Sequence, residues 1–214
     1  MIHFFNTATF AFLALFPILN PPAMAPIFLQ LTSRLGNAER NRVSALIGFY
    51  TFVLLTSLLF VGGWLLKVLG ISLPVISVAG GILLFHTAWT MLNRAPKMSD
   101  AEREELENYG VENAFFPLTL PVTAGPGSIA ITLTLVPNGS LATLPVVLDF
   151  LAIAAGIAAA SLTVFLFYRF SGHFLRRLGK TVNATISQIS AFILLAIGVQ
   201  IIWGGLRELL KTLN

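Results

Sequence analysis

Apolar residues run along this chain in six long blocks that are separated by short polar stretches. Each block reaches the length of about 20 residues that a helix needs to cross the hydrocarbon core of a bilayer. The predicted spans are Phe4–Leu31, Val43–Leu66, Ile71–Leu92, Ala114–Val136, Leu144–Tyr168 and Ile186–Leu206. This pattern predicts an all-α integral membrane protein of six transmembrane helices, in which residues 1–214 form a single domain in the lipid bilayer.

Prolines and glycines interrupt two of these spans. Span one contains Asn20-Pro21-Pro22 and then Pro26, and span four contains the stretch 116–128, with three prolines and two glycines. Proline lacks the backbone N–H that a helix uses, and its ring clashes with the preceding turn. We therefore predict that spans one and four are broken helices.

The two interruptions occupy matching positions, because several residues recur at a spacing of 100. The recurring pairs are Phe16/Phe116, Pro17/Pro117, Pro21/Pro121 and Pro26/Pro126. A second match pairs residues 78–84 with 189–195. We predict a duplication in which residues 1–92 are repeat one, residues 93–113 an acidic cytoplasmic linker and residues 114–214 repeat two. Each repeat has three spans, so the second copy enters the membrane upside down and the halves form two inverted 3+3 repeats.

Composition and charge support membrane insertion and indicate its direction. With 56% hydrophobic and 10% charged residues, the chain is too apolar for an ordinary soluble domain. The net charge of +4 forms no basic patch with interleaved aromatics, so nucleic acid is not an expected partner. Ten of the thirteen Lys and Arg residues fall on one side: Arg34, Arg40, Arg42, Arg94, Lys97, Arg103, Arg169, Arg176, Arg177 and Lys180. The positive-inside rule then predicts cytoplasmic loops 1–2, 3–4 and 5–6, with both termini outside.

The broken spans predict a polar binding site, because irregular backbone at membrane depth needs partners for its polar groups. Pro26 and Pro126 both suit the first position of a new helix. Just after Pro126, the N–H groups of Gly127 and Ser128 would face an anion such as a carboxylate. Freed carbonyls, hydroxyls and the Asn20 amide would accept bonds from an ammonium group. The predicted substrate-binding residues are Asn20, Pro21, Thr119, Thr123, Gly125, Pro126, Gly127 and Ser128. A small zwitterion fits this set best, and simple kinks without a ligand are the structural alternative.

A few other polar residues are candidates for function. His86 in span three and Gln200 in span six are candidates for coupling or for lining the cavity, with a hydrogen-bonded structural role as the alternative for each. Asp149 lies near the outer end of span five, where a structural or interfacial role is favoured. The chain has no cysteine, and we expect neither a metal site nor a cofactor.

Several segments together resemble the MarC family, which includes the SnatA-type small neutral amino-acid transporters. These segments are Asn20-Pro21, Ala38–Arg42, Ala79–Gly81, Phe116–Leu118, Ala124–Gly127 and Gly198–Gln200. The resemblance implies a six-span bacterial inner-membrane protein with broken first and fourth helices, and for SnatA-like members it implies transport of glycine, alanine or similar amino acids. Pro22 stands where many members have a smaller residue, and we expect it to change the cavity floor.

We therefore expect a secondary transporter that moves a small neutral amino acid or related small metabolite by alternating access. The sequence is compatible with a homo-oligomer and does not determine the oligomeric state. One alternative is a passive channel that uses the same broken helices as a filter. Another is an intramembrane serine hydrolase with Ser128 as nucleophile and His86 as base. The chain has no Gly-x-Ser-x-Gly elbow at Ser128, so we expect no enzyme. Gly127→Val is expected to abolish binding with little loss of folded protein.

Overall fold

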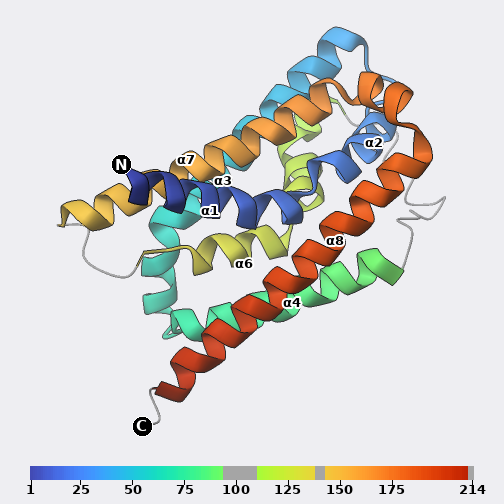
Figure 1. Ribbon diagram of the computed structural model, residues 1–214. Helices are drawn as coiled ribbons and strands as arrows, with labels where there is room; N and C mark the ends of the chain where they lie inside the picture. Colours follow the sequence, from blue (N-terminus) through green and yellow to red (C-terminus); the bar gives the residue numbers. More distant parts are fainter. Residues whose placement is uncertain (94–109, 138–142, 212–214) are drawn as a thin grey trace.

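The computed structural model describes residues 1–93, 110–137 and 143–211, and within them every regular element is a helix (Figure 1). The elements are α1 (Ile2–Leu19), α2 (Pro21–Leu31), α3 (Asn37–Val68), α4 (Leu73–Asn93), η1 (Val111–Asn113), η2 (Ala114–Thr123), α6 (Pro126–Thr134), α7 (Leu144–Arg169) and α8 (Ser171–Lys211). Most of the predicted acidic linker lies outside the described residues.

Five of these helices, α1, α3, α4, α7 and α8, are each long and apolar enough to cross a membrane. A sixth crossing results if Val111–Thr123 and Pro126–Thr134 form one span, whose two parts meet at an angle of 70°. The prediction of an all-helical protein with several membrane spans is therefore confirmed.

Two helices extend well beyond the apolar blocks that predicted them. α3 begins at Asn37 rather than near Val43, and α8 begins at Ser171, directly after the single residue Phe170 that ends α7. Arg and Lys are good helix formers, so charged residues next to an apolar block continue the helix rather than end it. Only Phe170 therefore separates the helices of spans five and six, where a longer loop was expected. Arg176, Arg177 and Lys180 lie within the range of α8.

Close helix crossings occur where one helix contributes a glycine. α4 and α8 lie side by side and antiparallel, and a Cβ atom added to Gly81 would lie 2.8 Å from Gly198 O (Figure 1). α7 contacts α1 in the same way, since a Cβ on Gly156 would lie 2.5 Å from Ala8 O. Small residues allow backbones to approach in lipid, where no hydrophobic effect drives helices together.

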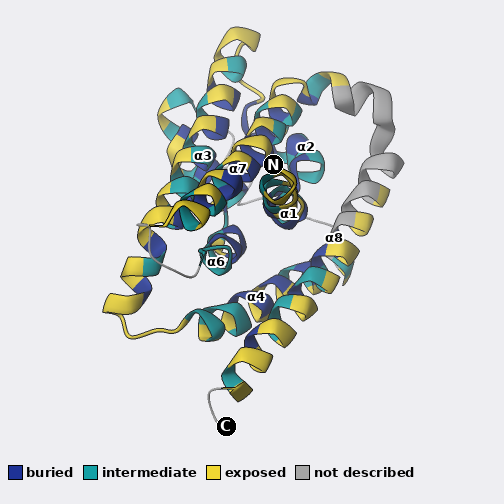
Figure 2. Ribbon diagram, turned by 60° about the vertical axis from the view of Figure 1, so that its left-hand side comes forward, coloured by how far each residue is buried: buried dark blue, intermediate teal, exposed yellow. Residues whose placement is uncertain are grey.

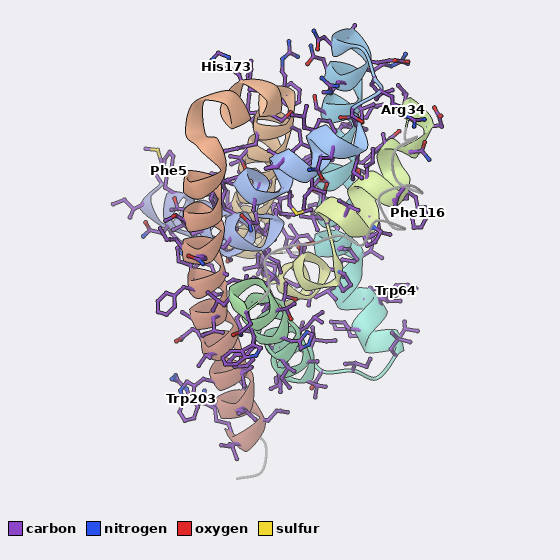
Figure 3. The ribbon with its side chains drawn as sticks, turned by 90° about the vertical axis from the view of Figure 1, so that its right-hand side faces the viewer. Phe5, Arg34, Trp64, Phe116, His173 and Trp203 are labelled. Atoms are coloured by element: carbon purple, nitrogen blue, oxygen red, sulfur yellow. The ribbon has the colours of Figure 1, made fainter. Side chains whose placement is uncertain are left out.

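Burial divides the helices into an inner and an outer face. The buried residues of α1, α3, α6 and α7 face one another at the centre of the bundle, and exposed apolar residues cover its outside (Figure 2). Phe5, Trp64, Phe116 and Trp203 are large exposed side chains that project from the periphery (Figure 3). An apolar exterior of this kind is expected for a protein whose solvent is lipid.

Candidate functional site

The first interruption centres on Asn20, which separates α1 from α2 and has left-handed backbone angles, φ 42° and ψ 54°. Asparagine is one of the few residues other than glycine that adopt this conformation readily. The Asn20 N–H donates to Phe16 O at 2.9 Å, and Asn20 O accepts from the N–H groups of Ala23 and Met24. The residue is only 4% exposed, and among the described residues neither Oδ1 nor Nδ2 has a hydrogen-bond partner.

The second interruption is η2, a wide helical segment with non-helical backbone angles at Phe116 and Leu120. Its hydroxyl groups bond within the same segment. Thr119 Oγ1 donates to Ala114 O at 2.6 Å, and Thr123 Oγ1 donates to Leu118 O at 2.7 Å. These two predicted site residues are buried, and both hydroxyls already have partners.

The start of α6 agrees with the prediction at one position and differs at another. Pro126 is the first residue of the helix and Gly125 precedes it in extended backbone. The N–H of Ser128, expected to face an anion, instead donates to Gly125 O at 3.0 Å, and its Oγ donates to the same oxygen at 2.8 Å. Both Ser128 groups are therefore hydrogen-bonded in a capping turn. Of the N–H groups in the first turn of α6, only that of Gly127 has no protein acceptor within the described residues.

The two interruptions contact each other through Gly127. A Cβ atom on Gly127 would lie 2.5 Å from Ile18 Cδ1 and 3.6 Å from Leu84 Cδ2. The end of α1 therefore packs against the start of α6, with α4 beside them. A methyl group at Gly127 would overlap the tip of the Ile18 side chain, so Ile18 would have to shift.

A buried tyrosine links the second interruption to α2. The Tyr168 hydroxyl lies 2.9 Å from Thr123 Oγ1, and the Tyr168 ring stacks on Phe28 with centroids 4.5 Å apart and planes at 11°. Tyr168 is almost fully buried. Sequence reasoning missed this residue, because a tyrosine at the end of an apolar span is also typical of a membrane-interface anchor.

A cavity of about 1060 Å³ lies between α1, α4, α6 and α8. Its wall is mainly apolar, with Phe10, Phe192 and Ile197 among its residues, and polar groups of Gln200, Arg207 and Glu208 also line it. Of the predicted candidates, Gln200 lines this cavity, whereas none of the predicted substrate-binding residues does. Ile131 lines the cavity one turn beyond Gly127, so the cavity ends close to the interruptions without including them.

The other polar candidates lie away from the interruptions. His86 is exposed on α4 and does not line the cavity, and its carbonyl accepts from Thr90 Oγ1. Asp149 lies at the start of α7, where its Oδ1 is 2.9 Å from His3 Nε2. His3 was not a predicted candidate, since the pairing joins residues far apart in the sequence. The described residues contain no group of three or more His, Cys, Asp or Glu side chains that could hold a metal ion.

A bundle of apolar helices with buried interruptions at its centre defines an integral membrane protein. The family model described as "MarC family integral membrane protein" matches residues 5–210, and the chain belongs to this family. It is 36% identical over 203 residues to the "UPF0056 membrane protein" of Aquifex aeolicus, and the alignment covers 94% of this chain and 92% of the relative. It is 31% and 32% identical, over 99% of each chain, to the "UPF0056 inner membrane protein MarC" of Citrobacter koseri and of Shigella flexneri. No solved structure matches this chain.

Proposed function

We propose that this protein is a secondary transporter that moves a small neutral amino acid or a related small metabolite by alternating access. One observation carries the proposal: two interrupted segments meet at the centre of the bundle, and the buried Asn20 amide there has no partner among the described residues. Buried polar groups are almost always hydrogen-bonded in folded proteins, so such a group points to a ligand. Interrupted helices in matching positions of two halves are typical of transporter binding sites.

The helix contacts support an inverted repeat. The contact of α1 with α7 corresponds to the contact of η2 and α6 with α3. In the same way, the contact of α2 with α8 corresponds to that of α6 with α4. Two further pairs, α3 with α7 and α4 with α8, each join the two halves. Exchanging span one with four, two with five and three with six maps this set of contacts onto itself. A two-fold axis in the membrane plane predicts this correspondence. We therefore propose that residues 1–92 and 114–214 are the two copies.

Contacts along α3 favour a fourth span that crosses the membrane over one that turns back. The Phe115 ring, near the start of η2, contacts Tyr50 with centroids 5.5 Å apart. Leu133, near the end of α6, lies against Gly62. Twelve residues of α3 separate these contacts, a rise of about 18 Å at 1.5 Å per residue. The second interruption therefore advances through the bundle, as the first does.

The cavity and the Tyr168 contacts lie toward opposite ends of the bundle, which supports alternating access. The cavity includes the first residues of α4, the last of α6 and the end of α8. Tyr168 and Phe28 lie near the ends of α7 and α2, beside the loops whose positive charges predict the cytoplasmic side. We propose that this conformation is open outward and closed inward, and that the closed side depends on the Thr123–Tyr168–Phe28 contacts.

The names of relatives and the charges of the loops support a proposal for where the protein lies in the cell. Relatives from Citrobacter koseri and Shigella flexneri are named inner membrane proteins. We propose the bacterial inner membrane for this chain as well, with loops 1–2, 3–4 and 5–6 in the cytoplasm and both termini outside.

Reconstituted protein tests the proposal directly. Liposomes containing the purified protein should take up or exchange labelled glycine, alanine or serine, and an imposed ion gradient should drive accumulation above the outside concentration. Equilibration that never exceeds the outside concentration under any gradient would favour a passive channel. A complete lack of uptake and exchange for all three amino acids would reject the amino-acid proposal.

We propose no catalytic activity. The Ser128 hydroxyl is buried and donates to Gly125 O, and His86 is exposed on the surface of α4. A serine nucleophile requires a base within hydrogen-bond reach. Hydrolysis of esters or peptides by the wild-type protein that is lost in Ser128→Ala would contradict this proposal.

A further inference from the structure

Three consecutive carbonyl oxygens at the end of α1 receive no backbone hydrogen bond within the described part of the chain. They belong to Pro17, Ile18 and Leu19. The residues four positions after the first two are Pro21 and Pro22, which have no N–H to donate. The N–H four positions after the third belongs to Ala23, and it donates to Asn20 O at 3.1 Å. The double proline and the left-handed residue thus leave three acceptors together.

The end of α1, like the ends of α4 and α6, has no basic residue in its last turn, whereas the ends of four other helices have a cation nearby. The last turns of α3, α7 and α8 contain Lys67, Arg169 and Lys211, respectively. The end of α2 is served by Arg40, whose Nη2 donates to Thr32 O at 2.8 Å and to Leu35 O at 3.1 Å. The C-terminal end of a helix carries a partial negative charge, which a cation stabilises. The last turn of α1 has no basic residue and ends inside the bundle, where water does not screen this charge.

The Asn20 side chain adds a fourth oxygen at the same place. Its amide is attached to the residue that directly follows the three carbonyls, it is nine-tenths buried or more, and its oxygen has no partner among the described residues. A buried amide left unpartnered costs free energy unless a ligand satisfies it. The helix end therefore favours a positively charged ligand, and the unpartnered amide oxygen beside it can bind the same ligand.

We propose that the end of α1 is a binding site for a monovalent cation, formed by the carbonyl oxygens of Pro17, Ile18 and Leu19 and by Asn20 Oδ1. Oxygen ligands suit hard cations, and a set without a carboxylate favours a single positive charge over a divalent ion. Two sources provide this chemistry: Na⁺, or the ammonium group of an amino acid. Binding of Na⁺ goes beyond the proposed function, whereas binding of the ammonium group rests on it.

Thermal unfolding of the purified full chain in detergent tests the site. Wild-type protein is compared in NaCl and in N-methyl-D-glucamine chloride of equal ionic strength, with and without glycine. We expect Na⁺, or glycine without Na⁺, to raise the unfolding midpoint by about 2–4 °C, the shift typical of a ligand stabilising a chain of this size by about 1 kcal/mol.

Asn20→Gly is the diagnostic variant, because glycine keeps the left-handed backbone and removes the amide. We expect it to lose the ligand-dependent rise while remaining at least as stable as wild type in N-methyl-D-glucamine. Thr51→Ala is the matched control, since Thr51 Oγ1 is another buried atom without a partner in the described residues and lies on α3. This control should keep the full rise.

A rise with Na⁺ that Asn20→Gly abolishes identifies Na⁺ as the ligand, and a rise with glycine alone that it abolishes identifies the ammonium group. No rise with either, or equal rises in wild type and Asn20→Gly, would overturn the site. Asn20→Asp provides a second measurement: its added charge should lower the half-saturating Na⁺ or glycine concentration several-fold, and an unchanged concentration counts against the site. Uptake by wild-type liposomes tests the proposed function without reference to Asn20, so the two failures are distinguishable.

Discussion

The interruptions in spans one and four match in sequence position but differ in how their polar groups are satisfied. At the first, both amide atoms of Asn20 are buried without a partner among the described residues. At the second, the hydroxyls of Thr119, Thr123 and Ser128 all donate to carbonyls of their own segment. A ligand therefore gains more at the first interruption, because there it satisfies groups that the protein leaves unpaired. The two halves of the predicted site thus differ in their unpaired polar side chains, although the sequence repeat that suggested the site is symmetric.

The contact between the interruptions should be the most sensitive to substitution. Gly127→Val places methyl groups where Ile18 Cδ1 already lies, so we expect a loss of about 1–3 kcal/mol in unfolding free energy. From the sequence alone we expect little loss of folded protein for this variant, so the size of the loss distinguishes the two expectations. Thermal unfolding in detergent measures the effect.

Two further variants check this explanation. Gly204→Ala is the matched control, because a Cβ there meets no atom within 4 Å, and it should be neutral or stabilising. Ile18→Ala should reduce the cost of Gly127→Val in the double variant. Equal costs with and without Ile18→Ala would show that the overlap is not the cause.

Removing a satisfied hydroxyl should cost more than removing the unsatisfied amide. Thr119→Val keeps the side-chain shape and deletes the bond to Ala114 O, so we expect a loss of about 1 kcal/mol. Asn20→Gly, measured without Na⁺ or amino acid, should cost nothing or stabilise the protein. Chemical or thermal unfolding of both variants in the same detergent gives the comparison. A larger loss for Asn20→Gly would mean that its amide has a protein partner.

The hydroxyl between the second interruption and α7 should have a smaller effect on stability. In Tyr168→Phe, the ring can still stack on Phe28 and Thr123 keeps its bond to Leu118 O, so we expect about 0.5–1 kcal/mol. If these contacts close the cytoplasmic side, the variant should also label faster at a cysteine introduced at Leu31, a buried residue of α2 outside these contacts. Labelling at the wild-type rate would separate Tyr168 from closure. The control is the same introduced cysteine in a protein that keeps Tyr168.

The pair formed by His3 and Asp149 should matter least. His3 is largely exposed, and its Nε2 lies 2.9 Å from Asp149 Oδ1. Exposed ion pairs contribute about 0–1 kcal/mol and are screened by salt. We expect His3→Ala to change the unfolding midpoint by about 1 °C or less and to leave uptake unchanged. A marked loss of uptake with an unchanged midpoint would give this pair a role in transport.

The span pattern and both interruptions follow from local chemistry. A run of apolar residues that is long enough forms a helix in lipid, because no other partner exists there for the backbone. Proline suits the first turn of a helix, and Pro126 begins α6 as expected, whereas α2 begins at Pro21 and continues through Pro26. The all-helical class and the helix start at Pro126 could therefore be predicted from the sequence, whereas the expected start at Pro26 is wrong because α2 begins five residues earlier.

The partners of the polar groups depend on distances that the sequence does not contain. Asn20 and Ser128 look equally available in the sequence, yet packing leaves the first unpaired and a capping turn uses the second. Tyr168 and Thr123 meet because α7 passes beside η2, and Ile18 meets Gly127 because α1 ends against α6. Local propensity determines where this chain bends, whereas the packing of distant helices determines which bend keeps an unsatisfied group for a ligand.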